Sequence, residues 1–414
     1  MHAADSARPR LLVIELEGAE TIARTAAEAG WHPVFVETGR YSRWVPPPER
    51  MEGLEVVHAP NPSFHRLYEL ATETRARSVL AMSLLEDECK RDALLKDLVQ
   101  AAGRGMRVVA NSPSAVALIA DKGLTKAVLR QAGVPVVPGG VVSTTAEALA
   151  AAEEVGYPAL LKPCQGFAGQ GIRLVRSAAE LASAFSRHAG RSYVLEPFVD
   201  GVEIAVEIIA WKGRTVRQPL VYKGHTREDL FEHPAYRPRL SPWNKPPRLR
   251  EKVVSLAEQV VDLLHLVGVV ELEFVVVGEE PYLMEVNPGT AGISRLCSVA
   301  SGIDTFALLA GVAIRDELRE DAAEEEGLCL SLPIVRPPEG RALAFLRAHQ
   351  AVRYVEPVSW MPLLPIKGNV VLRARAAADV PKLLADLEWL SAARYLDEVE
   401  SGIREGGWDC EESS

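Results

Sequence analysis

The sequence predicts a mixed fold, with a doubly wound α/β region followed by α+β regions. Residues 10–38 alternate strand, helix and strand, a pattern typical of a parallel sheet. Residues 158–177 place a glycine-rich turn between two apolar runs, and residues 271–288 form a second pair of strands that carries acidic side chains. The chain has 414 residues, 48% of them hydrophobic, which is enough to build packed cores in about two to four domains.

The N-terminal region, residues 1–111, is expected to be the doubly wound domain. Strands are predicted at 10–15, 32–38, 78–82 and 106–111, with helices between the first pair and the last pair. This region lacks the G-x-G-x-x-G fingerprint of dinucleotide-binding domains. Ser112 then caps a linking helix within residues 112–138, and the segment VPVVPG breaks the chain after it.

Residues 139–200 are predicted to form a small α+β unit around a glycine-rich hairpin. The segment KPCQGFAGQG, residues 162–171, lies between two strands, so it fits neither the Walker loop nor the Rossmann loop, which both open a helix. Glycines allow backbone N–H groups to approach phosphate oxygens, and Lys162 adds a charge at the strand end. A surface hairpin without a ligand remains the alternative. The glycines concerned are Gly166, Gly169 and Gly171.

Three side chains with oxygen atoms are predicted to converge in residues 271–288. Glu285 and Asn287 are two residues apart and therefore face the same side of a strand, while Glu273 belongs to the preceding strand of a hairpin. Magnesium prefers such hard oxygen donors and keeps positions open for water and phosphate. The sequence therefore predicts a metal that is shared with a nucleotide, although acidic side chains at strand ends also simply face solvent in many proteins.

Four segments in this order resemble the ATP-grasp superfamily over roughly residues 112–315. They are DKGLTKAVLRQAGVPVVPG at 121–139, the hairpin at 162–171, VLEPFVDGVEIAVEIIA at 194–210, and the pair ELEF and MEVNP at 271–288. The resemblance implies an ATP-grasp fold with a pre-ATP-grasp domain at 1–111, a lid subdomain at 139–200 and a catalytic subdomain at 201–325. A weaker resemblance to the L-amino-acid ligases implies a small C-terminal domain with an acidic tail at 326–414.

The resemblance also implies roles for individual residues. Lys122 and Lys162 would bind the ATP phosphates, with Lys162 also a candidate catalytic residue. Glu203 would accept hydrogen bonds from the ribose, unless it is only a cross-strand charge on an exposed face. Glu273, Glu285 and Asn287 would hold Mg²⁺, with Mn²⁺ as an alternative. The hinge that binds adenine through its backbone would consist of Glu196, Pro197, Phe198 and Val199.

The sequence departs from the superfamily pattern at Gly289, where many members carry an arginine after Asn-Pro. The stretch NPGTAGIS resembles the version in D-alanine ligase-like members, where the turn and Ser294 leave a backbone nest near the acyl group. Arg295 is a hypothetical replacement for the missing charge and hence a candidate catalytic residue; it is equally well explained as a surface arginine near a helix start. We place Gly289 and Ser294 among the candidate substrate residues.

A proline-dense connection at residues 231–247 is predicted to be a loop that either faces the substrate or is solvated. In and near it lie residues that could bind a carboxylate or a side chain of the substrate. These are His225, Arg227, Tyr236, Arg237 and Trp243.

Together these features predict an ATP-dependent ligase that activates a small carboxylate, such as an amino acid, as an acyl phosphate and joins it to an amine. A biotin carboxylase-like or purine-biosynthetic carboxylating enzyme is the alternative, and a non-catalytic nucleotide-binding regulator is a third reading. The substrates, the pathway and the oligomeric state are not encoded in any motif, although dimers are common in the superfamily.

Composition favours small-molecule partners. The net charge is −10 and no basic run is present, so nucleic acids and anionic membranes are unexpected partners. No apolar run approaches the ~18 residues of a membrane span, and the expected location is the cytoplasm. The five cysteines show no paired spacing and are expected to be reduced thiols. Cations near Cys164 favour a lowered pKa, but this thiol is expected to be a spectator and not a nucleophile.

Overall fold

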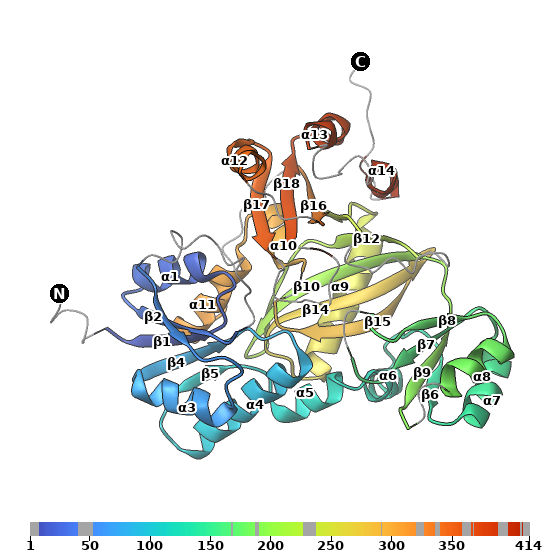
Figure 1. The fold of residues 1–414 in the computed structure, drawn as a ribbon, viewed down its shortest axis with the longest axis horizontal. Coiled ribbons are helices and arrows are strands. Elements are labelled where there is room, and N and C mark those ends of the chain that lie inside the picture. The colour runs from blue at the N-terminus through green and yellow to red at the C-terminus, as the bar shows by residue number, and fades with distance from the viewer. Residues whose placement is uncertain are drawn as a thin grey trace.

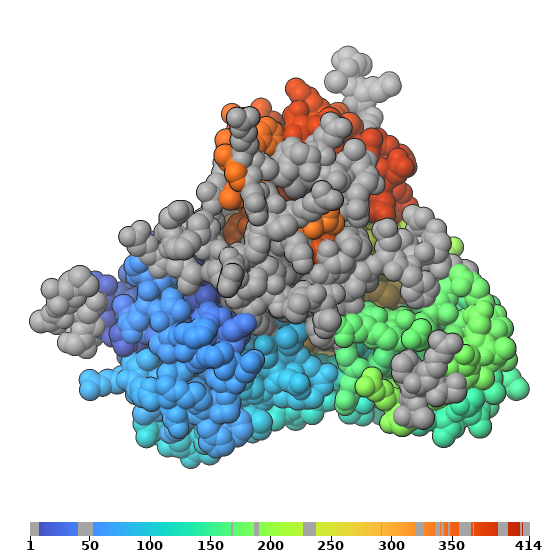
Figure 2. Space-filling model, viewed as in Figure 1, coloured from blue at the N-terminus to red at the C-terminus, as the bar shows by residue number. Residues whose placement is uncertain are grey.

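The computed structural model describes residues 8–39, 53–166, 169–186, 190–226, 237–290, 292–319, 327–335, 340–357, 366, 368–387, 396–405 and 408. Its three sheets form an N-terminal part, a lid and a large C-terminal part (Figure 1). Figure 2 shows the N-terminal part in blue, the lid in green, and the C-terminal end of the large part in orange to red.

The N-terminal sheet has five parallel strands in the order β3-β2-β1-β4-β5. Alternate side chains of β1 enter different cores: Leu11 and Val13 pack with α1 and α11, whereas Leu12 and Ile14 pack with α3 and α4. The expected doubly wound domain is therefore confirmed, although β3 and α3 were not predicted. Its elements are β1 (Arg10–Ile14), α1 (Ala19–Glu28), β2 (His32–Glu37), β3 (Glu55–His58), α3 (Phe64–Glu73), β4 (Ala76–Ala81), α4 (Glu86–Ala101) and β5 (Arg107–Val109).

Two helices, not one, link this sheet to the lid. α5 (Pro113–Ile119) begins at Ser112, whose hydroxyl accepts a hydrogen bond from Ala115 N, as predicted. α6 (Lys122–Gln131) begins at Asp121, whose carboxylate accepts from Leu124 N at 2.9 Å. Asp121 is a strong N-cap residue, and this second cap explains why the helix predicted across the segment is interrupted there.

The lid is an antiparallel sheet in the order β6-β9-β7-β8, with α7 and α8 contributing to its own apolar core. β7 and β8 pair as an antiparallel hairpin around the glycine-rich turn, so the predicted strand-turn-strand is confirmed. The elements are β6 (Gly140–Val142), α7 (Thr145–Val155), β7 (Ala159–Pro163), β8 (Arg173–Val175), α8 (Ala178–Ser186) and β9 (Tyr193–Pro197).

The large sheet runs in the order β15-β14-β10-β12-β13-β16-β18-β17, with β11 also paired to β10. α9 packs on one face, against Ile204 and Val206, whereas α10 and α11 pack on the other, against Ala205 and Ile209. The elements before residue 320 are β10 (Val202–Trp211), β11 (Arg214–Arg217), β12 (Val221–His225), β13 (Arg239–Ser241), α9 (Pro247–Leu263), β14 (Gly268–Val277), β15 (Glu280–Pro288), α10 (Ser294–Ser301) and α11 (Thr305–Arg315).

The C-terminal strands continue this sheet. Leu330 and Leu372 share one apolar core with Val206 and Leu272, so the strands after residue 326 extend the large sheet instead of building a separate sheet. The domain boundaries stay a prediction. The elements are β16 (Leu328–Ile334), α12 (Arg341–Ala348), β17 (Val352–Pro357), β18 (Gly368–Ala374), the 3₁₀ helix η3 (Ala377–Asp379), α13 (Val380–Asp386) and α14 (Leu396–Glu405).

Within the described ranges, no single helix is long and apolar enough to cross a membrane. α10 and α11 reach that length and composition only together, across a bend of 94°. Both helices contribute buried residues to the cores described above.

Candidate active site

The β14–β15 hairpin brings together the three predicted metal-binding residues. Glu273 is directly opposite Glu285 in the strand pairing, and Asn287 Nδ2 donates a hydrogen bond of 3.1 Å to Glu273 Oε1. The predicted convergence of these side chains is therefore confirmed. Their role as metal ligands stays a prediction.

The donors on this hairpin suit a hard cation. Two carboxylates and one amide meet here, and no set of three His, Cys, Asp or Glu side chains in the described residues forms a complete metal site. The carboxylates attract positive charge, since Lys122 Nζ lies 3.0 Å from Glu285 Oε1 and Lys223 Nζ lies 2.7 Å from Glu273 Oε1. An incomplete set of oxygen donors fits Mg²⁺, which keeps water and phosphate in its remaining positions.

Lys223 and Glu271 extend this charged face and were not predicted. Lys223 Nζ lies 3.4 Å from Glu271 Oε1, and both side chains are largely buried. Burial lowers the pKa of Lys223, but the charges of Glu271 and Glu273 more than offset it and leave the pKa raised. Burial raises the pKa of Glu271. For Glu273 burial is also the largest cause, but the charge and hydrogen bond of Lys223, with the charges of Arg239 and Lys162, together outweigh it and leave the pKa lowered. Glu271 alternates with Glu273 on β14, and this alternation is the sequence pattern from which Glu271 could have been predicted.

Glu196 is the centre of a second charged group, in the lid. Its side chain is 0% exposed and forms ion pairs with Lys126 and with Lys162, whose Nζ lies 2.7 Å from Glu196 Oε2. Burial alone would raise the pKa of Glu196, but the two ammonium charges hold it below its usual value. Burial lowers the pKa of Lys126 to about 8. Lys126 was missed, although it lies four residues after Lys122 on the same helix face.

The predicted adenine hinge lies at the end of β9. Glu196 pairs with Leu160 of β7, and Phe198 N donates to Pro158 O at 2.9 Å, so the Phe198 N–H is already used within the lid. Pro197 and Val199 are half-buried. The structure thus turns the Glu196 side chain towards the lysines, and adenine binding by this segment stays a prediction.

Glu203 and His225 lie close to the hinge. Glu203 Oε2 lies 3.2 Å from Arg237 Nη1, and His225 Nδ1 lies 3.4 Å from Asp200 Oδ1. The pairing of Glu203 with Gly224 places both residues at the same end of β10 and β12. Their roles towards ribose and substrate stay predictions. Arg227 and Tyr236 lie outside the described residues.

The glycine-rich turn is connected through Lys122 to the β14–β15 hairpin, which we name the metal hairpin after its predicted role. Lys122 Nζ donates to Gly166 O at 2.5 Å, while its backbone N donates to Cys164 O at 2.8 Å. Gly166, Gly169 and Gly171 have φ angles of 130°, 72° and 77°, values that side chains disfavour. Cys164 corrects an expectation, because its burial and then the charge of Asp121 raise its pKa to about 11. This thiol is therefore not activated by the cations nearby.

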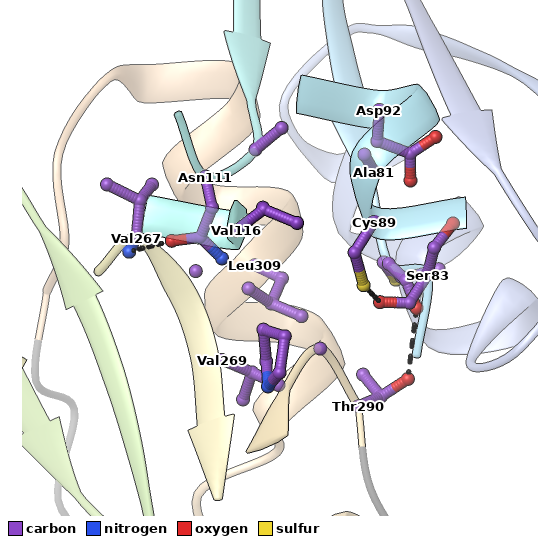
Figure 3. A pocket seen from close by; sticks show the side chains of 15 residues that line it. Ala81, Ser83, Cys89, Asp92, Asn111, Val116, Val267, Val269, Thr290 and Leu309 are labelled. Carbon is purple, nitrogen blue, oxygen red and sulfur yellow. Dashed lines mark hydrogen bonds between the residues drawn. The ribbon is translucent and has the colours of Figure 1, made fainter. Parts of the chain in front are cut away.

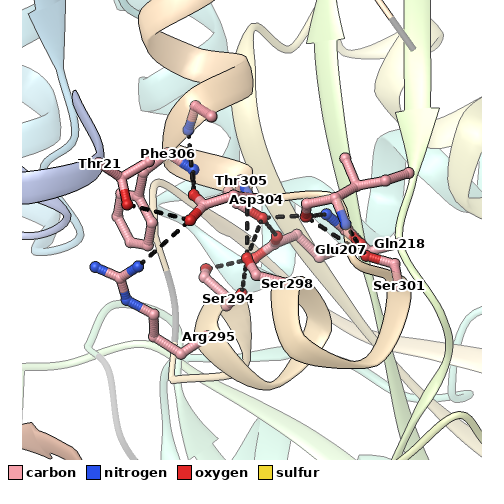
Figure 4. Close-up of polar contacts among 12 residues, drawn as sticks. Thr21, Glu207, Gln218, Ser294, Arg295, Ser298, Ser301, Asp304, Thr305 and Phe306 are labelled. Carbon is pink, nitrogen blue, oxygen red and sulfur yellow. Dashed lines mark hydrogen bonds and ion pairs between the residues drawn. The ribbon is translucent and has the colours of Figure 1, made fainter. Parts of the chain in front are cut away.

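The segment after β15 places Gly289, Ser294 and Arg295 in different surroundings, and Figure 4 shows the last two of these residues. Gly289 has a φ of 87° and packs against Ser83 O of the N-terminal region. Ser294 is 0% exposed and its hydroxyl donates to Glu207. Arg295 points to another side, with its guanidinium 3.9 Å from the Phe306 ring centre and 4.3 Å from that of Tyr354.

Trp243 is buried, contrary to its prediction as a residue of the proline-dense connection that faces a substrate. The side chain is 1% exposed and belongs to the core of the large sheet, and its backbone N donates to Leu220 O at 2.8 Å. Because β13 enters the sheet immediately before it, the chain around Trp243 is held against β12. Trp243 therefore stabilises the sheet and does not face a substrate.

A small cavity of ≈ 30 Å³ lies where the N-terminal sheet meets this turn (Figure 3). Ser83, Cys89 and Asp92 line it from the N-terminal side, and Gly289 and Thr290 from the other. Such a volume is large enough to hold ordered water.

Comparison with known families decides the assignment of the central segment. Residues 119–292 match a family model described as an ATP-grasp domain, and this range contains the lysines, the hairpin turn and the metal strands described above. The chain contains an ATP-grasp domain.

Solved structures with the same fold cover almost the whole chain. Biotin carboxylase from Campylobacter jejuni in complex with βγ-ATP is 19% identical with a TM-score of 0.70, and the match covers 92% of this chain and 90% of that one. N5-carboxyaminoimidazole ribonucleotide synthetase from Thermus thermophilus is 19% identical with a TM-score of 0.71, covering 92% and 98%.

A third structure was solved with nucleotide. The biotin carboxylase domain dimer of Hydrogenobacter thermophilus 2-oxoglutarate carboxylase, with MgADP, ADP and bicarbonate, is 20% identical with a TM-score of 0.71, covering 92% and 89%. At these identities the likeness establishes the ATP-grasp fold over the N-terminal sheet, lid and large sheet. A likeness to the L-amino-acid ligases was not found among these structures.

Proposed function

We propose that this ATP-grasp protein is an ADP-forming ligase that activates a small carboxylate as an acyl phosphate and transfers the acyl group to an amine. One observation carries the proposal. Lys122 contacts Gly166 of the glycine-rich turn and Glu285 of the metal hairpin, at 2.5 Å and 3.0 Å. The turn that we propose to bind phosphate and the hairpin that we propose to bind a cation are therefore within reach of one ammonium ion, an arrangement that suits a Mg²⁺-bound triphosphate.

Different charged residues would bind the phosphates and the Mg²⁺ ion of such a ligand. Lys122 and Lys162 supply point charges for the phosphates, and the pairing of Lys162 with Glu196 fixes the direction of its side chain. Glu273, Glu285 and Asn287 would hold Mg²⁺, which when bound would neutralise charge on the phosphates. The lid can then close over the nucleotide and exclude water.

The first chemical step needs no side-chain nucleophile. A carboxylate oxygen of the substrate attacks the γ-phosphorus, a new P–O bond forms, and the bond between the γ-phosphorus and the bridging oxygen breaks to release ADP. The amine then attacks the acyl carbonyl carbon, and the C–O bond to phosphate breaks. The products are an amide, phosphate and one proton from the amine. The protein contributes position and charge.

A carboxylating reaction is the second candidate. The structural neighbours include a biotin carboxylase domain solved with bicarbonate and a ribonucleotide synthetase that forms an N5-carboxyamino product. Bicarbonate is also an oxygen nucleophile towards the γ-phosphorus, so the same charges would serve it. The neighbours are distant in sequence, and this candidate rests on the shared fold.

ATP turnover tests the proposal directly. The protein with ATP and Mg²⁺ is incubated with pairs of amino acids, and phosphorus NMR separates ADP plus phosphate from AMP plus pyrophosphate while mass spectrometry identifies products. Parallel reactions contain bicarbonate with amines but no amino acid. Glu285→Gln serves as the control for a background nucleotidase, because it removes one charge of the metal hairpin.

The outcomes separate the candidates. ADP with a condensed amide that disappears in Glu285→Gln supports the ligase. ADP that depends on bicarbonate supports carboxylation instead, and AMP with pyrophosphate contradicts the acyl-phosphate mechanism. ATP binding without turnover for every acceptor would favour the regulator reading.

A further inference from the structure

The turn after the metal strand has no room for the arginine found there in many ATP-grasp proteins. Gly289 has a φ of 87°, and a Cβ atom at this position would lie 2.2 Å from Ser83 O. Both the backbone conformation and the contact with the N-terminal region therefore exclude any side chain. A charge for the transferring phosphoryl group must come from elsewhere in this chain.

Arg295 is engaged on another side of the turn. Its guanidinium stacks between the rings of Phe306 and Tyr354 and lies 3.9 Å from Asp304 Oδ2. The side chain is 7% exposed. These contacts explain Arg295 as a residue that joins α10 to α11 and β17, and they direct its charge to Asp304 (Figure 4).

Arg239, unlike Arg295, directs its guanidinium to the turn that follows the metal strand β15. It begins β13, and its Nη1 donates a hydrogen bond of 3.0 Å to Gly292 O, three residues after Gly289. The guanidinium thus lies against the same turn that follows the metal strand. The missing side chain of Gly292 leaves space for this guanidinium, because a Cβ atom there would lie 2.9 Å from Arg239 Nη1.

The charge of Arg239 reaches the metal hairpin. It favours the ionised forms of Glu271 and Glu273 and opposes the charge on Lys223, although burial and the ion pairs among these three groups act more strongly on them. Arg239 and Lys223 are therefore two cations beside one pair of carboxylates. With one N–H of five committed to Gly292 O, a guanidinium can still bind a phosphoryl oxygen in a bidentate manner.

We propose that Arg239, held by Gly292 O against the turn after β15, is the catalytic cation that binds the transferring phosphoryl group in place of an arginine at position 289. The inference rests on the proposed phosphoryl transfer. The inference explains both glycines of the turn. Gly289 allows the backbone of the N-terminal region to approach the turn, and Gly292 leaves space for the Arg239 guanidinium of β13.

Binding of a phosphoryl mimic tests the inference without turnover. Calorimetry compares the affinity for ADP with Mg²⁺ alone and for the same nucleotide with aluminium fluoride, which imitates a planar transferring phosphoryl group. For Arg239→Ala we expect ADP affinity within about twofold of the unmodified protein and a loss of about 100-fold for the mimic, the size found when one charge-stabilising donor is removed. Arg239→Lys should recover part of the loss.

Two further variants separate position from charge. Gly292→Ala keeps the arginine but displaces its guanidinium, so it should weaken the mimic by a smaller factor than Arg239→Ala; the backbone there needs no left-handed conformation, so the fold should tolerate the methyl group. Arg217→Ala is the matched control, since Arg217 also comes from the large sheet and pairs with Glu258 at 3.2 Å. Thermal unfolding checks that each variant folds.

The inference is overturned if Arg239→Ala binds the mimic as tightly as the unmodified protein, or if Arg295→Ala alone loses that affinity. It also fails if the unmodified protein binds the mimic no more tightly than ADP. Mimic binding that depends on Arg239, together with bicarbonate-dependent ADP formation and no amide product, would contradict the proposed ligase and leave the inference standing, because a phosphoryl group is still transferred.

Discussion

Glu207 illustrates what residue-level patterns do not reveal. It is 0% exposed, its two oxygens accept hydrogen bonds from Ser294 and from Thr305, the latter at 2.6 Å, and it is paired across the strands with Glu271. Burial raises its pKa to about 7. The convergence of Glu273, Glu285 and Asn287 was predictable because strand side chains alternate, whereas the partners of Glu207 come from α10 and α11 and depend on tertiary packing.

We expect Glu207→Gln to change how stability depends on pH. A group whose folded pKa lies above its unfolded value contributes stability that is complete below the unfolded value of 4.5 and is lost as pH rises through about 7. Chemical unfolding should therefore show the unmodified protein losing stability relative to Glu207→Gln between pH 5 and 8, by up to about 3 kcal/mol.

The control is Glu279→Gln, at an exposed turn position. Its unfolding free energy should differ from that of the unmodified protein by a constant amount over the same range. Parallel curves for Glu207→Gln would contradict a neutral Glu207 at low pH.

At the scale of elements, local patterns predicted the hairpins but not their surroundings. The strands of the lid and the β14–β15 pair were predictable from apolar runs and turn residues, and the cap at Ser112 from its hydroxyl. The break before α6 was missed because Asp121 lies within an otherwise helical pattern. Trp243 was misplaced because β13 is only three residues long and leaves no periodic signal.

α6 provides the second prediction, because its first residue joins the lid to the large sheet. Lys122→Gln removes the charge that contacts Gly166 O and Glu285 Oε1. We expect the dissociation constant for ATP with Mg²⁺ to rise at least about tenfold, since a hydrogen bond to a charged group contributes about 1.5–3 kcal/mol. Calorimetric titration measures this change.

Lys252→Gln is a matched control for Lys122→Gln. Lys252, in α9, also pairs with a glutamate of β15, but this residue, Glu280, is the first of the strand. That pair is exposed and should contribute little. Equal ATP affinities for Lys122→Gln and Lys252→Gln would remove Lys122 from the phosphate site.

At the scale of the whole molecule, one apolar core joins the N-terminal sheet to the large sheet, whereas the lid has a core of its own. Leu11 and Phe35 of the N-terminal sheet share a core with Ile209 and Val269 of the large sheet, through Phe306 of α11. The lid core contains lid residues only. Strand patterns indicated the C-terminal strands, but alternation does not specify which neighbour a strand pairs with, so their place in the large sheet required the structure.

We expect Phe306→Ala to loosen the N-terminal sheet and the large sheet together. The ring is 0% exposed and packs so closely on the turn before α1 that a methyl group at Gly18 would lie 2.2 Å from Phe306 Cδ1. Truncation of such a ring costs about 3–5 kcal/mol. Hydrogen exchange with mass spectrometry should therefore show faster exchange in β1 and β4 and in β10 and β14.

Leu181→Ala is the complementary variant, because Leu181 is 0% exposed in the lid core. Exchange should rise there only in the lid, since no described residue outside the lid belongs to that core. If Phe306→Ala affects one sheet alone, the N-terminal and large sheets unfold independently despite their shared core. If Leu181→Ala loosens all three parts, the lid is not the separately moving cap that closure over ATP requires.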